Sequence, residues 1–319
     1  MTAIETTALT KRYGDVVALD GLDLTVKQGE VFGFLGPNGA GKSTTIDLLL
    51  GFLSPTDGQA SVLGHDVVSE SRQIRRRTGL LPEGYGMYDR LTGREHLAYA
   101  IETKGAADDP DDLLDRTGLE PDARDRRAGG YSKGMRQRLA LAIALVGDPD
   151  LLVLDEPSSG LDPAGMQEIR TLVREEAASG TTVFFSSHLL SEVEAVCDRV
   201  GILANGSLAA VDSIDGLRAL MDTDATLSLE VDTEPRIDLT DVRGVTGVTW
   251  TGTHLEVTCS ESRAKAAVVQ RVADVTSVHD VSIGESSLED LFEAVTDGER
   301  VQSNSDGRSN LGPQGELTV

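Results

Sequence analysis

The chain has 319 residues, with 53 acidic against 29 basic residues and a formal net charge of −24. A surface of this sign repels nucleic acid and anionic lipid at low salt, so no nucleic-acid partner is expected. The sequence contains no uninterrupted apolar run of about 18 residues, which excludes a conventional membrane-spanning helix.

The first motif in chain order lies between a predicted strand and a predicted helix. Residues 30–35 form an apolar run typical of a buried strand, and residues 45–50 follow as a predicted helix. The stretch between them fits the complete phosphate-loop pattern G-x-x-x-x-G-K-[ST]. Its residues are Gly36, Pro37, Asn38, Gly39, Ala40, Gly41, Lys42, Ser43 and Thr44.

This loop is predicted to bind the phosphates of a nucleotide. Its glycines let backbone N–H groups turn toward one point, and the following helix adds the partial positive charge of its N-terminus. Lys42 is expected to reach the β- and γ-phosphates, and the Ser43 hydroxyl to bind Mg²⁺. A glycine-rich turn with a chance lysine is the alternative, and the flanking strand and helix argue against it.

A mainly helical region follows over residues 84–145 and contains the second motif. Residues 131–138 read Tyr-Ser-Lys-Gly-Met-Arg-Gln-Arg and lead into an apolar helix. Ser132 is a predicted helix N-cap, and Gly134 permits close approach of the backbone to another group. A capped helix with basic residues on its solvated face would look the same in isolation.

The third motif places two carboxylates after a buried strand. Residues 151–154 are apolar, and Asp155 and Glu156 follow directly. Ligands of open α/β sheets bind at the carboxyl ends of the strands. Asp155 is expected to orient Mg²⁺ or its bound water, and Glu156 to act as general base on the attacking water. A strand that runs into a solvated turn is the alternative.

Taken together, these motifs resemble the ATP-binding subunit of an ABC transporter, over roughly residues 4–212. Residues 131–135 match the family's signature loop, usually Leu-Ser-Gly-Gly-Gln, with departures at Tyr131, Lys133 and Met135 like those of the ABC-2 exporter branch. The resemblance implies an α/β fold, a phosphate-loop NTPase of the ABC nucleotide-binding type with a helical subdomain at about 84–145. Ser132, Lys133 and Gly134 would then contact ATP held by another subunit.

Three further residues gain roles from the resemblance. Tyr13 matches the aromatic residue that stacks on adenine, and Asp162 lies in the loop that crosses between paired subunits. His188 matches the switch histidine that senses the γ-phosphate. Without the resemblance, each has an ordinary alternative: a surface tyrosine, a turn and a structural histidine.

One position departs from the family pattern in charge. The family usually has a glutamine that contacts the metal site and the permease, and this chain has Glu83 in the segment 79–87. We expect Glu83 to keep this coupling role by holding a water or a metal-bound water. A solvated loop acid is the alternative.

The resemblance also implies partners. Two chains would pair as a homodimer with two ATP molecules and Mg²⁺ at their interface, and a separate transmembrane permease would use the energy, most simply for export. No secretory signal is recognised at the start, and Cys197 and Cys259 form no close metal pair. We therefore expect a cytoplasmic subunit, attached to the cytoplasmic face of the membrane through the permease.

Other functions stay open at this point. An ATPase of a copper transporter for nitrous oxide reductase maturation shares the residues 131–138 pattern and the Pro-Glu pair. A soluble ABC-type ATPase outside transport, or a phosphate-loop small-molecule kinase, would keep the loop as well. The acidic surface and the presence of the signature segment weigh against these last two.

The domain limits follow from changes in pattern. Residues 1–215 are predicted to form the ATPase domain, and residues 216–296 a small α+β accessory domain that stabilises the dimer or regulates it. That domain is predicted to contain strands at 225–231, 248–251, 254–258 and 278–283, a helix at 262–273 and a closing amphipathic helix at 287–295. Residues 297–319 have the composition of a disordered tail.

The acid-rich, lysine-poor composition resembles that of proteins from salt-accumulating halophiles. Molar salt shortens the Debye length to about 3 Å and would screen the repulsion between acidic side chains. The sequence therefore predicts a protein whose stability rises with salt.

Overall fold

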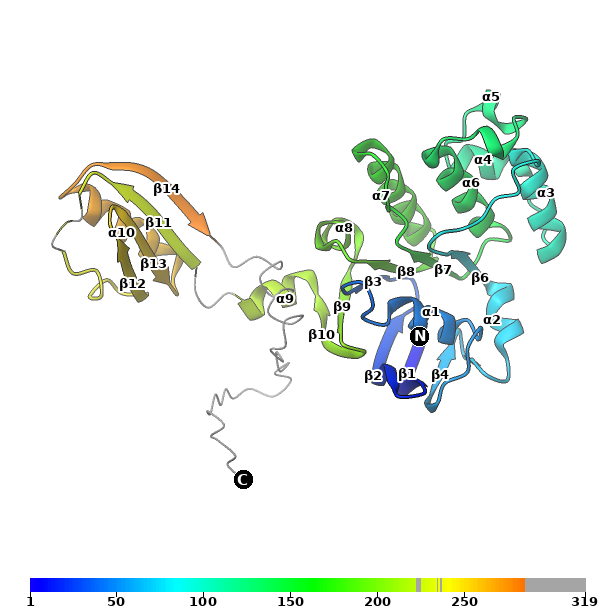
Figure 1. Ribbon diagram of the computed structural model, residues 1–319, viewed down its shortest axis with the longest axis horizontal. Helices are drawn as coiled ribbons and strands as arrows, with labels where there is room; N and C mark the ends of the chain where they lie inside the picture. Colours follow the sequence, from blue (N-terminus) through cyan, green and yellow to red (C-terminus); the bar gives the residue numbers. More distant parts are fainter. Residues whose placement is uncertain (222–224, 234, 236, 285–319) are drawn as a thin grey trace.

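The computed structural model describes residues 1–319 except 222–224, 234, 236 and 285–319. Three sheets lie within the described part of the chain (Figure 1). Two of them, with their helices, make up the part that holds the sequence motifs, and the third follows residue 224. The predicted closing helix at 287–295 and the tail at 297–319 lie outside the described residues.

The first sheet is antiparallel and has the order β2-β1-β4-β5. Its strands are β1 (Thr2–Tyr13), β2 (Val16–Lys27), β4 (Asp57–Val62) and β5 (His65–Asp66). β1 and β2 alternate buried and exposed residues, and Ile4, Leu9, Leu22 and Val26 are fully buried. The pairing of β1 with β2 runs from Thr2 to Tyr13 and so continues beyond the fully buried positions.

The second sheet has the order β10-β9-β3-β8-β7-β6 and carries the motifs. Five of its strands are parallel, and β10 is antiparallel to β9. The strands are β3 (Val31–Leu35), β6 (Thr78–Leu81), β7 (Leu151–Asp155), β8 (Thr182–Ser187), β9 (Arg199–Ala204) and β10 (Ser207–Ser213). The turn from β9 to β10 uses Asn205 and Gly206 at positive φ, as expected for an Asn-Gly hairpin.

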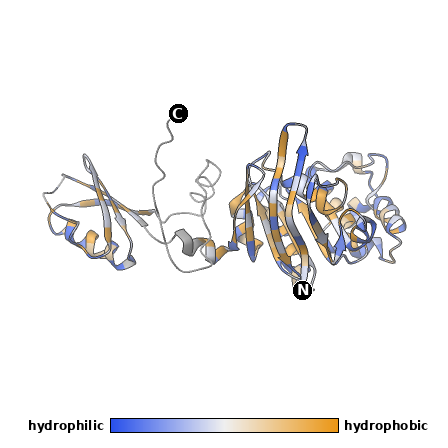
Figure 2. Cartoon of the chain, turned by 90° about the horizontal axis from the view of Figure 1, so that it is seen from below, coloured by the Kyte–Doolittle hydropathy of each residue, from blue (hydrophilic) through white to orange (hydrophobic). Residues whose placement is uncertain are grey.

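The central strand β3 is buried on both faces, which matches its continuous apolar run. Phe34 packs on Phe184 of β8 with ring centroids 5.2 Å apart. On the opposite face Gly33 has no room for a side chain, since an added Cβ would lie 2.4 Å from Val193 Cγ1. Figure 2 shows hydrophobic residues within the strands of the part that carries the N-terminus, and the buried β3 supports the loop that follows it.

Four helices accompany these two sheets, and a further group forms a helical subdomain. The first set comprises α1 (Lys42–Leu49), α2 (Ser71–Arg77), α7 (Pro163–Ala178) and α8 (Leu190–Val196). The helical subdomain comprises α3 (Gly93–Lys104), α4 (Pro110–Arg116), α5 (Pro121–Arg124), the 3₁₀ turn η1 (Ala128–Gly130) and α6 (Lys133–Leu145). Thr92 and Glu95 form a capping box at the start of α3.

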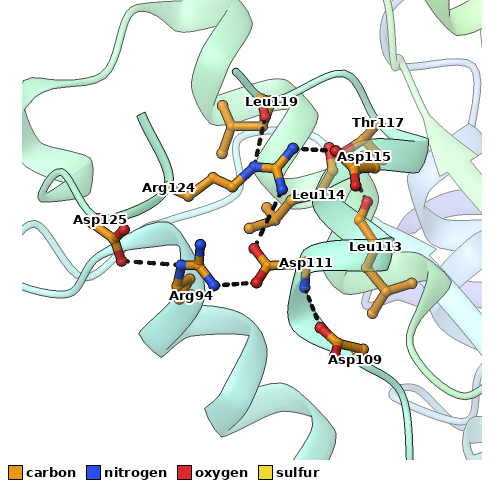
Figure 3. A network of polar contacts seen from close by, with 10 residues as sticks. All are labelled: Arg94, Asp109, Asp111, Leu113, Leu114, Asp115, Thr117, Leu119, Arg124 and Asp125. Atoms are coloured by element: carbon orange, nitrogen blue, oxygen red, sulfur yellow. Dashed lines mark hydrogen bonds and ion pairs between the residues drawn. The ribbon is translucent and has the colours of Figure 1, made fainter. Parts of the chain in front are cut away.

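Ion pairs join three helices of this subdomain (Figure 3). Asp111 of α4 pairs with both Arg94 of α3 and Arg124 of α5. The Arg124 side chain is 8% exposed, also pairs with Asp115, and donates from Nε to the Leu119 carbonyl over 3.1 Å. A buried arginine with this many acceptors fixes the ends of α4 and α5, which precede the signature segment.

The third sheet is antiparallel, with the order β12-β13-β11-β14. Its elements follow α9 (Ile214–Met221) and are β11 (Ala225–Val231), β12 (Val245–Thr251), β13 (His254–Cys259), α10 (Ser262–Ala273) and β14 (Val278–Gly284). Leu227, Leu255 and Val257 share a buried cluster with Val268 and Val272 of α10. This α+β unit therefore has its own core, consistent with an accessory domain at 216–296, whose exact limits stay a prediction.

Candidate functional site

The phosphate loop joins β3 to α1 at the carboxyl end of the central strand. Gly39 and Gly41 have φ of 83° and 111°, in the left-handed region that glycine adopts without strain. At Gly41 an added Cβ would lie 2.7 Å from the Ala18 carbonyl oxygen. Lys42 is buried, and its Nζ donates to the Gly36 carbonyl over 2.7 Å, so the lysine curls back across the loop.

The two predicted carboxylates lie at the end of β7, two strands from the loop in the sheet order. Both side chains are buried. Asp155 Oδ1 accepts a 2.5 Å hydrogen bond from the hydroxyl of Ser186, at the end of β8. Glu156 has a φ of 50°, unusual for a residue with a side chain, and its backbone N–H donates to the Ser186 carbonyl over 3.2 Å.

The strained backbone of Glu156 turns its carboxylate toward two basic groups. Oε1 lies 3.2 Å from Lys42 Nζ, an ion pair in which the oxygen has no aligned hydrogen bond. Oε2 lies 2.8 Å from Nδ1 of the exposed His188. Lys42 and His188, which come from two other motifs of the sequence, thus both contact the Glu156 carboxylate. A positive φ at a residue with a side chain is a backbone strain that is typical of functional sites.

Negative charge gathers beside the phosphate loop. Asp47, on α1, has its pKa raised by burial and by the charge of Asp155. Ser43 is exposed at the first turn of the same helix. One hydroxyl with one or two carboxylates, completed by phosphate oxygens, is the donor set that Mg²⁺ prefers in nucleotide sites. Within the described residues, no cluster of three or more histidine, cysteine or acidic residues could hold a metal without such help.

A hydrogen-bonded chain links the Glu83 segment to the residues that follow β7. The Tyr85 hydroxyl donates to Gln137 Oε1 over 2.7 Å, and Gln137 Nε2 donates to the Pro157 carbonyl over 2.5 Å. Burial raises the pKa of Tyr85 to about 12, so its hydroxyl stays a donor. The link therefore fixes the segment before α3 relative to the residue that follows Glu156.

Glu83 shares a cavity of about 320 Å³ with the carboxylates of Asp155 and Glu156. Its lining residues are Pro82, Glu83, Gly84, Tyr85, Lys133, Arg136, Gln137, Asp155, Glu156 and Ser159. Acidic and basic side chains from three motifs face this single space. No residue of the phosphate loop lines this cavity, so it lies on the side of Asp155 and Glu156 that faces the Glu83 segment and the signature segment.

Comparisons with known proteins agree with this geometry. A family model described as ABC transporter matches residues 19–159. The chain is 44% identical over 223 residues to the bacitracin transport ATP-binding protein BcrA of Bacillus licheniformis, covering 68% of this chain and 72% of that protein. It is 37% identical over 308 residues to the daunorubicin/doxorubicin resistance ATP-binding protein DrrA of Streptomyces peucetius, covering 92% of each.

The chain belongs to the ABC transporter family, as an ATP-binding and ATP-hydrolysing subunit. The solved dimeric structure of MJ0796, a bacterial ABC transporter cassette, has a TM-score of 0.61 to it at 25% identity. That likeness covers 66% of this chain and 98% of the cassette. The ABC nucleotide-binding fold expected from the sequence is therefore confirmed.

The ABC ATPase holds its signature residues away from its own phosphate loop. Ser132 caps α6 by accepting from the Met135 N–H, and Asp162 caps α7 by accepting from the Gly165 N–H over 2.9 Å. Ser132, Lys133, Gly134 and Asp162 line a second cavity of about 880 Å³, and no residue of 36–44 does. The signature segment therefore faces a cavity that the phosphate loop does not line.

One predicted residue, Tyr13, belongs to the antiparallel sheet and not to the sheet that carries the other motifs. Tyr13 ends β1 with 48% of its surface exposed, and Lys11 Nζ lies 5.2 Å from its ring centroid. An exposed ring at this place is free to stack on a flat ligand. No helix of the described residues is both long and apolar enough to cross a bilayer.

Sequence reasoning missed several supporting residues of this site. Ser186, Gln137, Tyr85 and Asp47 hold or perturb the predicted groups through contacts that no short motif encodes. Gln137 and Tyr85 lie inside segments that were singled out, and only the fold brings them within hydrogen-bond distance. Ser186 is separated from Asp155 along the chain and meets it only because β7 and β8 pair.

Proposed function

We propose that this ABC ATPase works as a homodimer that binds two Mg²⁺–ATP, hydrolyses them, and drives a separate ABC-2 type permease in export. The observation that carries the proposal is the position of Glu156 between Lys42 and His188. A buried carboxylate between a phosphate-binding lysine and a histidine is placed to take a proton from water beside a γ-phosphate. The subunit would act at the cytoplasmic face of the membrane through its permease.

Hydrolysis then rests on positioning and charge. The phosphate-loop backbone and Lys42 would hold the β- and γ-phosphates, and Tyr13 would stack on adenine. Glu156 would accept the proton of the attacking water, while His188 would keep Glu156 oriented and contact the γ-phosphate. Ser43 and Asp155, with Glu83 through a water, would hold Mg²⁺, which neutralises the phosphate charge when bound.

Pairing of two chains completes the site. Ser132, Gly134 and Asp162 face a cavity apart from the phosphate loop, so their expected contact with nucleotide needs a second subunit. The dimeric cassette of MJ0796 supports this arrangement, since the same fold forms a dimer there. ATP held between the two half-sites would close the dimer, and hydrolysis would release it.

A groove between the core and the helical subdomain supports the permease as partner. The groove encloses about 800 Å³ and is lined by residues of α2, β6, α3 and α6. The rings of Tyr88 and Tyr99 make an edge-to-face contact on it and are 63% and 58% exposed. Exposed aromatic side chains in a groove are typical protein-binding anchors.

We infer export of a drug-like, lipid-like or polymer cargo, and the relatives support the drug-like class. BcrA and DrrA are described in terms of bacitracin transport and daunorubicin resistance. DrrA matches over 92% of this chain, a span that includes most of the third sheet. Cargo itself would be recognised by the permease.

Affinity purification tests the partner. The Glu156→Gln variant, loaded with Mg²⁺–ATP in native membranes, should bring down a polytopic membrane protein. The same purification from Tyr88→Ala/Tyr99→Ala cells should recover much less of it, with the melting temperature as the control for folding. Recovery of soluble proteins alone would contradict the transport role.

A further inference from the structure

The strand β8 ends in two fully buried serines, Ser186 and Ser187, after the apolar residues 183–185. A hydroxyl at this depth costs free energy unless it is hydrogen-bonded. In the sheet order, β8 lies between β3, which leads into the phosphate loop, and β7, which ends at Asp155. The two serines therefore lie at the end of the strand that separates the phosphate loop from the two carboxylates.

The Ser186 hydroxyl contacts two residues of the site at once. The sheet register pairs Ser186 with Asp155. A serine hydroxyl has one proton and a carboxylate can only accept, so the proton lies in the 2.5 Å hydrogen bond to Asp155 Oδ1. A lone pair of the same oxygen accepts the backbone N–H of Glu156 over 3.2 Å. One buried side chain thus joins the carboxylate of Asp155 to the backbone of Glu156.

These two contacts fix different groups. At Asp155 the hydroxyl occupies Oδ1, while Oδ2 has no hydrogen bond within the residues that the structure describes. Oδ2 is therefore the oxygen left for Mg²⁺ or its bound water in the proposed site. At Glu156 the hydroxyl holds the N–H of a residue with a φ of 50°, a strained backbone that persists only where its surroundings fix it.

The neighbouring Ser187 makes a separate set of hydrogen bonds. Its hydroxyl donates to Oε2 of the buried Glu192 over 2.9 Å and accepts the Leu189 N–H over 3.0 Å. Neither bond reaches Asp155 or Glu156. Of the two serines, only Ser186 therefore acts on the carboxylate pair.

We propose that Ser186 is a positioning residue of the ATPase site, whose hydroxyl orients Asp155 toward the metal and holds the backbone of Glu156. This role rests on the ATPase function proposed above. Without the hydroxyl, Asp155 would lose the charge-assisted hydrogen bond that selects its oxygen. The Glu156 N–H would keep the Ser186 carbonyl, which also lies 3.2 Å away. The larger loss therefore falls on metal-dependent binding of nucleotide.

Nucleotide binding with and without metal separates this role from a general loss of stability. The nonhydrolysable analogue AMP-PNP is titrated into the full chain in Mg²⁺ and in EDTA. Ser186→Ala should raise the Kd about fivefold in Mg²⁺ and by less than about twofold in EDTA, since the lost bond acts through Asp155. Ser186→Thr keeps a hydroxyl and should recover most of the affinity in Mg²⁺.

Two further variants make the outcome decisive. Thr182→Val removes another buried hydroxyl from β8, one that accepts the Gly29 N–H over 3.0 Å, and should leave both Kd values unchanged. Asp155→Asn should remove most of the gain in affinity that Mg²⁺ gives. A Ser186→Ala chain with an unchanged Kd in Mg²⁺, or one weakened equally in Mg²⁺ and in EDTA, would overturn the proposal alone. A wild-type chain that binds AMP-PNP no better with Mg²⁺ than with EDTA would overturn the proposed function, and this role with it.

Discussion

Lys42 Nζ lies 3.2 Å from Glu156 Oε1, which joins the phosphate loop to the carboxylate that follows β7. Both side chains are almost fully buried, so this pair is poorly screened by solvent. The lysine that is expected to hold the γ-phosphate therefore also sets the position of the expected general base. In the proposed mechanism, phosphate binding and water activation would therefore both depend on Lys42.

His188 is predicted to be essential for turnover through Glu156. Removing the imidazole in His188→Ala takes away the 2.8 Å contact to Glu156 Oε2 and the proposed γ-phosphate contact. We expect kcat to fall about 100-fold with a smaller change in KM, because the proposed general base Glu156 would lose the group that orients it. Steady-state phosphate release measures both. The neighbouring Leu189→Ala is the matched control, and a His188→Ala enzyme as fast as that control would contradict the role.

The ionised carboxylate of Asp47 is predicted to lower the free energy of unfolding. Burial and the charge of Asp155 raise its pKa above the ordinary 3.8, so folding binds a proton that the unfolded chain releases. This loss in the free energy of unfolding is absent below about pH 3.8, the pKa of the unfolded chain. It grows as the pH rises from there through the folded-state pKa, and then stays constant. Asp47→Asn should therefore raise the melting temperature at pH 7, and the gain should vanish near pH 3. A gain that is equal at both pH values would rule out ionisation as the cause.

The Tyr85–Gln137–Pro157 link is predicted to stabilise the connection between the Glu83 segment and the core. Tyr85→Phe removes one hydroxyl donor and leaves Gln137 Oε1 without it. We expect a loss of about 1 kcal/mol in the free energy of unfolding. Urea denaturation measures this loss. Tyr99→Phe removes the hydroxyl of an exposed ring and serves as the control. It should change the free energy of unfolding by less than half as much as Tyr85→Phe does.

Salt is predicted to stabilise the fold. With a net charge of −24, the folded chain repels itself, and ions at molar concentration screen that repulsion. The melting temperature should rise between low salt and molar KCl. A parallel series in which sucrose replaces KCl at equal osmolarity separates charge screening from the exclusion of solute from the protein surface. A melting temperature that stays flat or falls in KCl would refute the halophile-like interpretation.

The sequence predicts the parts of this fold whose signals are local. Residues 30–50 show strand, glycine loop and helix in order, and the structure confirms that order in β3 and α1. The turn between β9 and β10 also has a local signal, because Asn205 and Gly206 both adopt positive φ, as an Asn-Gly hairpin turn favours. The strand predicted at 248–251 is too short, because β12 begins at Val245, where its pairing with β13 begins.

The site was predictable as a set of motifs and not as a geometry. Nothing local in the sequence places Glu156 at positive φ, or brings Lys133 over Gly160. Those relationships depend on the sheet order and on how the helical subdomain packs against the core. The roles assigned to Tyr13, Glu83 and Asp162 stay predictions that need nucleotide and a second subunit to test.

The central claim is that Glu156 activates water in an ATP-closed dimer. The most direct measurement compares the wild-type subunit with Glu156→Gln by sedimentation velocity in Mg²⁺–ATP, alongside phosphate release from the same samples. The variant should form a stable dimer with ATP while its turnover falls at least about 100-fold. A Glu156→Gln subunit that hydrolyses ATP at the wild-type rate, or that stays monomeric with saturating ATP, would contradict the account.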